Sequence, residues 1–403
     1  MAPTNLNRTQ TPVPGLAVKV GVAVLCRILF NTVRRFVYPF AAVLSRGLGV
    51  PLTAVTTLIA VNQATGILGL FFGPLADRFG YRLIMLIGLG MLTFGMLAVG
   101  MFPYYWVVMI ALFLAGLGKN AFDTAIQSFF AHRIPFERRA RIVGAVELGW
   151  AGSTLIGIPI AGLLMDNLGW RSFFFVTGVM GALGILAIKI LIEGRSDAGN
   201  SALPVSSMGS ALLRMSRDRT VFGALTFSFL ANVANDNLFV VYGAWLEDSF
   251  GLSIVALGIG TAVIGLAELS GEFFTSSFSD RIGLKRSVVI GVILSAICYA
   301  ALPFVGISLP LALGSLFSIF LTFEFFIVTF LSLCIELKPE MRATMVAGNL
   351  AAAGLGRIAG ALMGGVIWVS GGLVAVALTS AAVSCLALAA LIWGLKRWPN
   401  TQA

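Results

Sequence analysis

Residues 73–82 read Gly73-Pro74-Leu75-Ala76-Asp77-Arg78-Phe79-Gly80-Tyr81-Arg82, and residues 276–285 read Ser276-Ser277-Phe278-Ser279-Asp280-Arg281-Ile282-Gly283-Leu284-Lys285. The second stretch lies 203 positions after the first and repeats its Asp-Arg pair, its glycine and its final basic residue. Without a gap, the same offset pairs Glu137 with Glu340 and Arg139 with Arg342. Coincident charged residues in two separate loops indicate that the chain is a duplicated unit.

Long apolar runs surround both copies of this loop. The 403 residues are 58% hydrophobic and 11% charged, with a mean hydropathy of +0.97, whereas soluble domains carry about 25% charged residues. A helix that crosses a bilayer needs about 20 apolar residues. Turn and charge signals divide the chain into twelve such spans, near 18–44, 53–75, 83–101, 105–130, 140–164, 172–192, 220–245, 254–278, 287–304, 310–335, 344–368 and 373–394.

The sequence therefore predicts an all-α membrane protein with twelve transmembrane helices in two pseudo-symmetric halves of six. Because six is even, the halves share one orientation and are related by an axis along the membrane normal. The expected domains are a cytoplasmic tail (1–17), a first bundle (18–192), a Ser- and Gly-containing cytoplasmic linker (193–219), a second bundle (220–395) and a short cytoplasmic tail (396–403). The first span is too long for a signal-peptide core, so we expect the N-terminus to be retained.

The net charge of +10 follows the expected loops. Of the 27 Lys and Arg residues, 19 fall in tails, in loops after even-numbered spans or, for Lys19 and Arg141, at the span ends beside them. Two (Arg46 and Arg171) lie on the other side, and six lie further inside spans. This is the positive-inside bias of a multi-pass protein of the cell (inner) membrane with both termini in the cytoplasm. It leaves no basic surface that would indicate nucleic-acid binding.

Signs of catalysis, of metal binding and of other cofactors are absent from the sequence. The four cysteines are scattered without a C-x-x-C spacing, and there is one histidine. Gly118-Lys119-Asn120 lacks the first glycine and the hydroxyl of an ATP-binding loop. We expect no enzyme, no catalytic residue, no metal and no cofactor, and an ion gradient as the energy source.

Gly73–Arg82, its copy at Ser276–Lys285, the twelve spans and the central linker resemble the major facilitator superfamily over the whole chain. The resemblance implies transport by alternating access in a protein that functions as a monomer. It also implies that the loop residues lock the halves together on the cytoplasmic side when the cavity faces outward: Gly73, Asp77, Arg78, Gly80 and Arg82, with Asp280 and Arg281 in the repeat. From the residues themselves, we expect Asp77 to accept from Arg78 or Arg82 and Gly80 to allow a tight turn.

The fifth span carries Gly157-Ile158-Pro159-Ile160-Ala161-Gly162, which is similar to the Gly-Pro motif of antiporter branches of that family. The resemblance implies efflux by exchange. The fourth span departs from the proton antiporters, because Leu112 stands four residues before Gly116-Leu117-Gly118 where those proteins carry an arginine. Lys119, directly after the second glycine, is the residue that could substitute for it.

Ionised side chains within the spans give the candidate site. Each costs about 2.5–3.5 kcal/mol at mid-bilayer, so these groups must be paired or must face water. Several fall on the first, fourth, seventh and tenth spans, which line the central cavity in the family that the chain resembles. We predict a mixed polar and aromatic pocket for a small amphipathic solute, with these candidates: Arg27, Asn31, Arg34, Arg35, Tyr38, Lys119, Asp123, Asn235, Asp236, Phe239 and Glu324. The alternative is that they are internal ion pairs that fix helix packing.

Burial favours the neutral form of a carboxyl, so a buried carboxyl can bind and release a proton as the cavity changes sides. The candidates for proton coupling are Asp236, Glu324 and Asp123, in that order. Asp123 follows Lys119 by four residues on one helical face and is expected to pair with it. Glu268 and Glu272 could pair with Arg357 at a similar depth, and structural or gating roles are favoured for all three.

The most concrete functional prediction is proton-coupled efflux of a small organic solute. A proton-coupled uptake symporter for an organic anion, held by Arg34 and Arg35, is the second hypothesis. A non-transporting membrane scaffold or sensor is the third, although such a protein has no need for costly charges within the bilayer. The expected partners are a small-molecule substrate, protons or another coupling ion, and the lipid bilayer.

Overall fold

The computed structural model describes residues 15–69, 72–133, 146, 149–192, 218–338 and 341–396, and every regular element in these ranges is a helix. In the first part of the chain they are α1 (Leu16–Arg35), α2 (Ala41–Leu48), α3 (Leu52–Leu68), α4 (Phe72–Phe79), α5 (Tyr81–Met101), α6 (Tyr105–Arg133), the π-helical η2 (Ser153–Gly157), α8 (Ile158–Leu168) and α9 (Ser172–Leu191). In the second part they are α11 (Arg219–Phe239), α12 (Tyr242–Phe250), α13 (Ile254–Ile282), α14 (Leu284–Val305), α15 (Leu309–Leu337) and α16 (Arg342–Gly394).

Ten of the described helices are long and apolar enough to cross a membrane, and the pair α2 and α3, bent by 115°, raises the number to at most eleven. The predicted number was twelve. The largest difference is at α16, which runs for 53 residues where the sequence predicted two spans. A straight helix of that length would be about 80 Å long. Gly372 interrupts it, however, with φ 60° and ψ −155°, so the two parts meet at a kink.

Positive-φ glycines recur at the offset of the sequence repeat. Gly80 precedes α5 with φ 91° and ψ 141°, and Gly283 precedes α14 with φ 90° and ψ 133°. Gly169, which separates α8 from α9 with φ 79°, lies 203 positions before Gly372. Only glycine adopts such angles without strain. The repeat predicted from charged residues is therefore also present in the backbone conformation, at Gly80 and Gly283 and at Gly169 and Gly372.

The two groups of helices meet where α1 and α11 end. Pro39 follows α1, and because proline lacks an N–H and clashes with the carbonyl four residues earlier, a helix does not continue through it. Val240 and Val241 separate α11 from α12 at the repeat offset, without a proline. A Cβ on Gly243 would lie 2.2 Å from the carbonyl oxygen of Pro39. Only a glycine at position 243 therefore allows the two backbones this close together.

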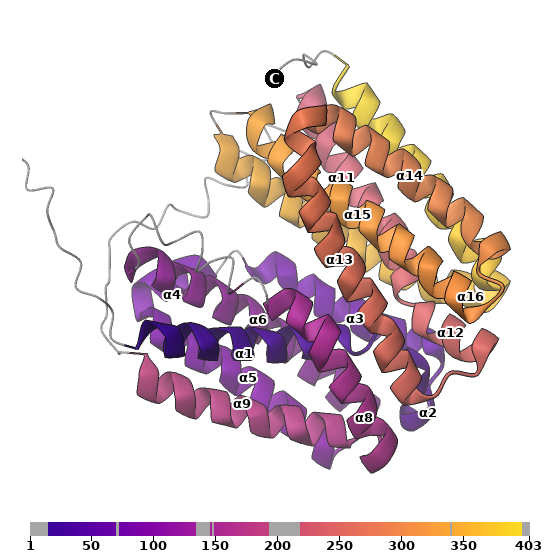
Figure 1. Ribbon diagram of the computed structural model, residues 1–403. Coiled ribbons are helices and arrows are strands. Elements are labelled where there is room, and N and C mark those ends of the chain that lie inside the picture. The colour runs from indigo at the N-terminus through magenta and orange to yellow at the C-terminus, as the bar shows by residue number, and fades with distance from the viewer. Residues whose placement is uncertain are drawn as a thin grey trace, which may run out of the picture.

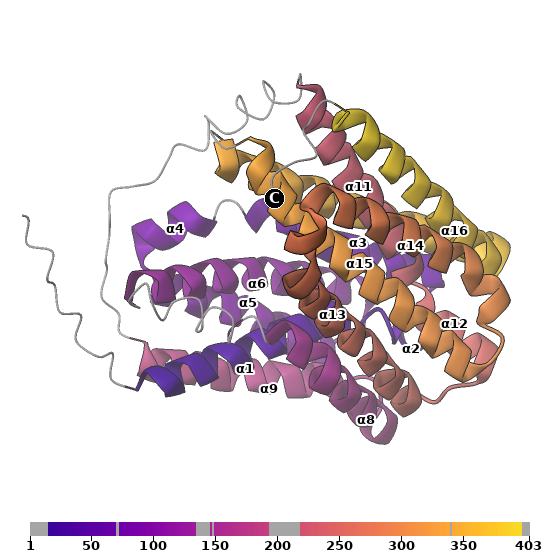
Figure 2. The same cartoon turned by 45° about the horizontal axis from the view of Figure 1, so that its top comes forward.

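Figures 1 and 2 show the indigo-to-magenta helices α1–α9 in one group and the pink, orange and yellow helices α11–α16 in the other. The groups meet near α2, α8 and α12 and diverge toward α4 and α11. Three further contacts join them. Gly162 packs against the carbonyl of Ile254, Gly365 packs against Thr56, and Arg46 pairs with Glu247 at 2.6 Å. We call this the closed end of the molecule.

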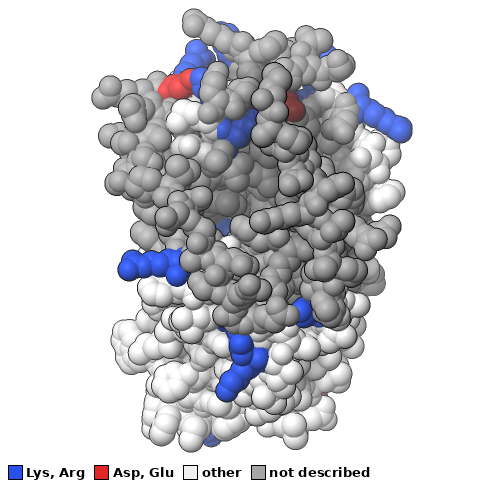
Figure 3. All heavy atoms as spheres, turned by 90° about the vertical axis from the view of Figure 1, so that its left-hand side faces the viewer, with Lys and Arg blue, Asp and Glu red and all other residues white. Residues whose placement is uncertain are grey.

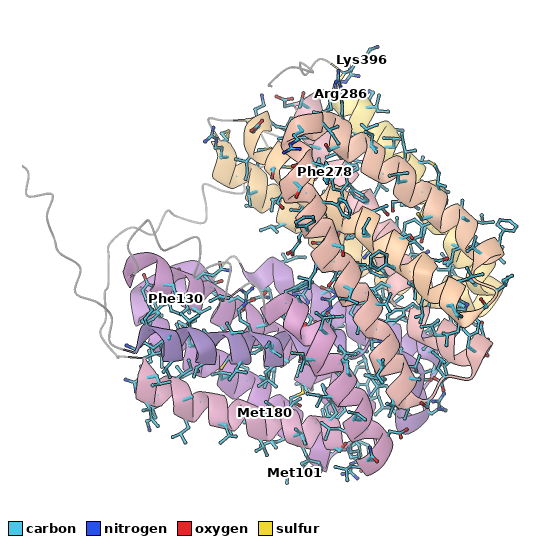
Figure 4. The ribbon with its side chains drawn as sticks, in the orientation of Figure 1. Met101, Phe130, Met180, Phe278, Arg286 and Lys396 are labelled. Carbon is cyan, nitrogen blue, oxygen red and sulfur yellow. The ribbon has the colours of Figure 1, made fainter. Side chains whose placement is uncertain are left out.

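The opposite end carries basic side chains. Figure 4 places Arg286 and Lys396 together at that end of the second group, and Met101 at the far end of the first group. On the face in Figure 3, the visible described side chains include several Lys and Arg and few Asp and Glu. Most of the expected tails and linker lies outside the described residues. The described parts are Gly15, Leu16 and Ala17 of the first tail, Asp218 and Arg219 of the linker, and Lys396 of the last tail.

Candidate functional site

A pocket lies between the two groups of helices, and its wall combines charged, amide and aromatic side chains. Its lining comprises Arg34, Arg35, Tyr38, Gln63, Trp150, Asn235, Asp236, Phe239, Glu268, Phe320, Phe323, Glu324 and Arg357. Seven of the eleven predicted cavity residues are among them. The free volume is about 40 Å³, which is room for a few water molecules. In this conformation, side chains fill most of the pocket.

Arg35 and Glu268 form a buried ion pair across the two groups, from α1 to α13. The Arg35 Nη1 donates to Glu268 Oε2 at 3.0 Å, and Nη2 donates to Oε1. The two side chains are only 5% and 8% exposed. The guanidinium also lies 4.5 Å from the ring centroid of Trp150, a favourable cation–π distance. The expected pairing of Glu268 with Arg357 is therefore wrong, because Arg35 occupies the carboxylate of Glu268.

A chain of hydrogen bonds leads from Arg34 across the interface to Asp236. Arg34 donates to Gln63 Oε1, Gln63 Nε2 donates to the Tyr38 hydroxyl at 2.5 Å, and that hydroxyl donates to Asp236 Oδ1 at 3.2 Å. Tyr38 also stacks on Phe239, with 4.1 Å between ring centroids. The chain begins at a cation on α1 and ends at a carboxylate on α11, and all its donors point the same way.

Three polar groups of the second half complete the pocket. Arg357 Nε donates to Asn232 Oδ1 at 3.1 Å. Among the described residues, the Glu324 carboxylate makes no hydrogen bond and no ion pair, although it lies near the charges of Arg35 and Arg357. Asn235 is 6% exposed, and its buried Oδ1 has no partner in the described chain. Glu324 and Asn235 are thus the acceptors with unused capacity.

The other four predicted cavity residues lie outside this pocket. Lys119 pairs with Asp123 on one face of α6, as expected, and Arg27 Nε also reaches Asp123 at 3.1 Å. Asn31 is fully buried and donates to the carbonyl of Gly149 at 3.3 Å. Asp123 therefore has two cationic partners within the first group. This arrangement fits the alternative of internal ion pairs better than a role in proton coupling.

The repeated loops use their last basic residue to hold helix ends. Arg82 donates to the carbonyl of Lys189 at 2.6 Å, and Lys285 donates to the carbonyl of Leu395 at 3.1 Å. Each bond satisfies a carbonyl at the C-terminal end of the last helix of its half, which is favourable for a cation. The sequence suggested Asp77 as a partner for Arg82, and the contact with the Lys189 carbonyl was not predicted.

The remaining loop residues are described only in part. The side chains of Asp77 and Asp280 lie outside the described residues. Arg78 lies 5.3 Å from the ring of Phe79, and Arg281 is exposed. A Cβ at Gly73 would meet Thr124 at 3.9 Å, an ordinary contact, so packing here does not require a glycine.

Six pocket residues were missing from the predicted cavity residues: Gln63, Trp150, Glu268, Phe320, Phe323 and Arg357. Structural or gating roles had been favoured for Glu268 and Arg357. Gln63 carried a usable signal, because a neutral amide within an apolar span is also costly to leave unpaired. It stands beside Asn62 in α3, and amides had been considered only in the first and seventh spans. Trp150 and Phe320 carried no sequence signal, since aromatic residues are common in apolar spans.

Among the described residues, no group of three or more His, Cys, Asp or Glu side chains is placed to hold a metal ion. The pocket is built from two arginines and a glutamine on one side and three carboxylates on the other, with Arg357 on the carboxylate side.

Comparisons with known proteins agree with this architecture. The family model described as Major Facilitator Superfamily matches residues 23–235 and 225–402. An uncharacterized MFS-type transporter YceJ of Bacillus subtilis is 24% identical over 74% of this chain and 75% of its own. A multi-drug resistance efflux pump PmrA homolog of Lactococcus lactis is 24% identical over 70% of each chain.

The class C tetracycline resistance protein of Escherichia coli is 26% identical over 58% of this chain and 59% of its own. The solved structure of the nucleoside transporter NupG superposes with a TM-score of 0.77 at 14% identity, covering 93% of this chain and 99% of that one. A bacterial homolog of the human lysosomal transporter Spinster gives 0.75 at 15% identity, covering 96% and 99%. The chain thus belongs to the Major Facilitator Superfamily and is a membrane transporter, not an enzyme.

Proposed function

We propose that the protein exports a small organic solute in exchange for protons, by alternating access of the pocket between its two halves. The observation that carries the proposal is the buried pocket itself, in which Asp236 and Glu324 on one half face arginines on the other. Relatives named as multidrug and tetracycline resistance proteins support efflux as the direction.

The proposed architecture has twelve crossings in two halves of six, functional as a monomer. The kink at Gly372 supports the count, because Gly169 divides α8 from α9 at the equivalent point of the first half. The basic side chains opposite the closed end support a cytoplasmic location for that end and for both termini, in the inner membrane. The pocket would then be shut off from the outside in the conformation described.

Proton coupling is assigned to Asp236 and Glu324. Asp236 faces Tyr38, Arg34, Arg357 and Tyr299, and its carboxylate is the end of the chain that starts at Arg34. A proton on Asp236 removes the negative charge at the end of this hydrogen-bond chain. The chain is then less favourable, and Arg34 becomes available to another acceptor. The substrate site and the proton site would thereby affect one another through Gln63 and Tyr38.

Glu324 has a different environment, since Glu268 and Glu272 lie near it as well as Arg35 and Arg357. The negative charges of Glu268 and Glu272 disfavour a negative charge on Glu324, so a proton on Glu324 relieves repulsion. Glu268 is held by Arg35, which leaves Glu324 as the group that accepts the proton. Loading it would weaken the attraction between this wall of the pocket and the arginines opposite.

Proteoliposomes that enclose a pH-sensitive dye test the proposal. A solute gradient directed inward drives protons out under antiport, so the lumen becomes alkaline, and drives protons in under symport, so it becomes acidic. Tetracycline and ethidium are suitable probes. We expect alkalinisation, which Asp236→Asn and Glu324→Gln abolish, and which Glu336→Gln, an exposed acid on the same helix as Glu324, leaves intact. Unaltered proton movement in both site variants would overturn the assignment of the coupling residues.

Uptake of an organic anion with protons is the second candidate, favoured by the absence of any carboxylate hydrogen-bonded to Arg34 in the described chain. Acidification of the lumen with an anionic probe would select it. The third candidate, a scaffold or sensor, predicts no flux for any probe.

A further inference from the structure

Two guanidinium groups reach the pocket from opposite halves without a carboxylate partner. Arg34 on α1 donates to the amide oxygen of Gln63, and Arg357 on α16 donates to that of Asn232 at 3.1 Å. Their positive charges are close enough to repel each other. Arg35 differs, since its donors already meet both oxygens of Glu268. The pair available to a ligand is therefore Arg34 and Arg357, not Arg34 and Arg35 as the sequence suggested.

Asp236 is near enough to act on both arginines, and Asp123 also acts on Arg34. The Oδ1 of Asp236 accepts from Tyr38, however, and among the described residues no ion pair joins this carboxylate to either arginine. An anion that replaces the two amide oxygens would give each guanidinium an acceptor of opposite charge, so that donor and acceptor are both ionised. It would also remove the repulsion between the two guanidinium groups.

The wall beside the pair is aromatic. Phe239 stacks on Tyr38 with 4.1 Å between centroids and on Tyr242 with 5.4 Å, and Phe320 meets its edge at 4.9 Å. Rings prefer such offset or edge contacts with further rings. The unpartnered Oδ1 of Asn235, on a side chain that is 6% exposed, lines the same pocket and could accept from a donor on a ligand.

We propose that Arg34 and Arg357 bind the anionic group of an aromatic solute, a carboxylate or sulfonate, whose ring packs against Phe239 and Phe320. The inference rests on the proposed function for the identity of the pocket, and it names the class of substrate. The free volume of about 40 Å³ is smaller than such a molecule. Binding therefore requires Arg34 and Arg357 to leave Gln63 and Asn232 and swing toward the ligand.

The test measures binding to the purified full-length protein in detergent by calorimetry. The probes are 1-naphthalenesulfonate, its neutral analogue 1-naphthalenesulfonamide, and the 1-naphthylmethylammonium cation, which share one ring system. We expect the sulfonate to bind about tenfold or more tightly than the sulfonamide. Arg34→Gln and Arg357→Gln should each reduce that ratio toward one, whereas Arg286→Gln, at the far basic end (Figure 4), should leave it unchanged.

A conservative variant separates recognition from folding. Arg34→Lys keeps the charge but loses the planar two-donor geometry. We therefore expect its ratio of sulfonate affinity to sulfonamide affinity to lie between the ratios of the parent and of Arg34→Gln. Equal affinity for the three probes, tightest binding of the cation, or a ratio that survives both Gln variants would overturn the proposal. Should Arg34→Gln fail to fold, the parent's preference among the probes and the Arg357→Gln ratio still decide it.

The outcome is independent of transport. Selective sulfonate binding without any solute-driven proton flux in proteoliposomes would retain the anion site and refute the proposed antiport. Proton flux driven by ethidium together with no preference for the sulfonate would retain the antiport and refute the anion site.

Discussion

The ion pair between Arg35 and Glu268 offers the most direct test of how the two halves are held together. Both side chains are less than a tenth exposed, and two hydrogen bonds join them across the interface. Removing one partner, by Arg35→Gln or Glu268→Gln, leaves the other charge buried and unpaired, which costs about 3–5 kcal/mol. That charge regains water if the halves separate at the closed end. We therefore expect each single variant to shift the equilibrium toward separation by about a hundredfold or more.

Thr56 provides the reporter for separation. It is 1% exposed and packs against Gly365 of the other half, so a cysteine at this position reacts with a membrane-impermeant thiol reagent only when the closed end opens. In a background without the four native cysteines, both single variants should label much faster than the parent. The double variant carries neither charge, and its labelling should return most of the way to the parental rate.

Arg46 and Glu247 form the matched control, because they also join the halves but the arginine is 61% exposed. An exposed pair contributes about 0.2–1 kcal/mol, so its single variants should change labelling less than about sixfold. If the Arg35 and Glu268 single variants label no faster than these controls, or if the double variant labels as fast as the singles, the pair does not hold the closed end shut.

Further predictions concern the backbone contacts and one helix cap. Gly243→Ala places a methyl group against the Pro39 carbonyl and should lower the melting temperature, at a cost of about 1–3 kcal/mol, whereas Gly314→Ala, with no atom within 4 Å of its Cβ, should not. Gly283→Ala forces an alanine into φ 90° and should cost about 1–3 kcal/mol by the same measurement. Asp218→Ala removes an N-cap and should cost about 0.5–2 kcal/mol at pH 7. The hydrogen bond from Lys338 lowers the pKa of Asp218, so this stabilisation is fully present above the ordinary value of 3.8 and is lost as the pH falls through the lowered pKa of the folded protein. The difference in melting temperature between parent and variant should therefore narrow as the pH falls below 3.8, and a difference that does not narrow would contradict the assignment.

The sequence predicted the parts of the fold that depend on local chemistry. The repeat of Asp-Arg-x-Gly predicted equivalent loops, and Gly80 and Gly283 adopt φ of 91° and 90°. This could be foreseen because a tight turn with positive φ needs a glycine, and the glycine can be seen in the sequence. The pair between Lys119 and Asp123 could also be foreseen from local spacing, because residues four apart share a helix face.

Contacts between the halves could not be predicted in this way. Arg35 and Glu268 are 233 positions apart, and helical periodicity fixes which face a side chain occupies but not which distant face it meets. The expected partner of Glu268 was therefore taken from its own half. For Gln63, an amide within an apolar span was a usable signal, but its partners Arg34 and Tyr38 could not be foreseen from any pattern within α3.

The backbone repeats between the halves, but the charged side chains of the pocket do not. At the 203-residue offset, Arg34 corresponds to Asn237, Asp236 corresponds to Val33, and Glu324 corresponds to Ala121. The duplicated features are mechanical ones: the loop glycines, the basic residues that hold helix ends, and the breaks at the closed end.

The pocket is accordingly polarised, with two arginines and a glutamine from the first half facing three carboxylates from the second. Opposite charges on the two halves attract each other across a buried interface, where that attraction is strong. Each proton that binds a carboxylate weakens the attraction, and an anion that binds the arginines competes with it. A pocket with the same charges on both halves would hold facing groups that repel, so its closed form would lack this attraction. Under the proposed antiport, the loss of symmetry in the side chains is what gives the closed halves an attraction that a proton or an anionic substrate would weaken.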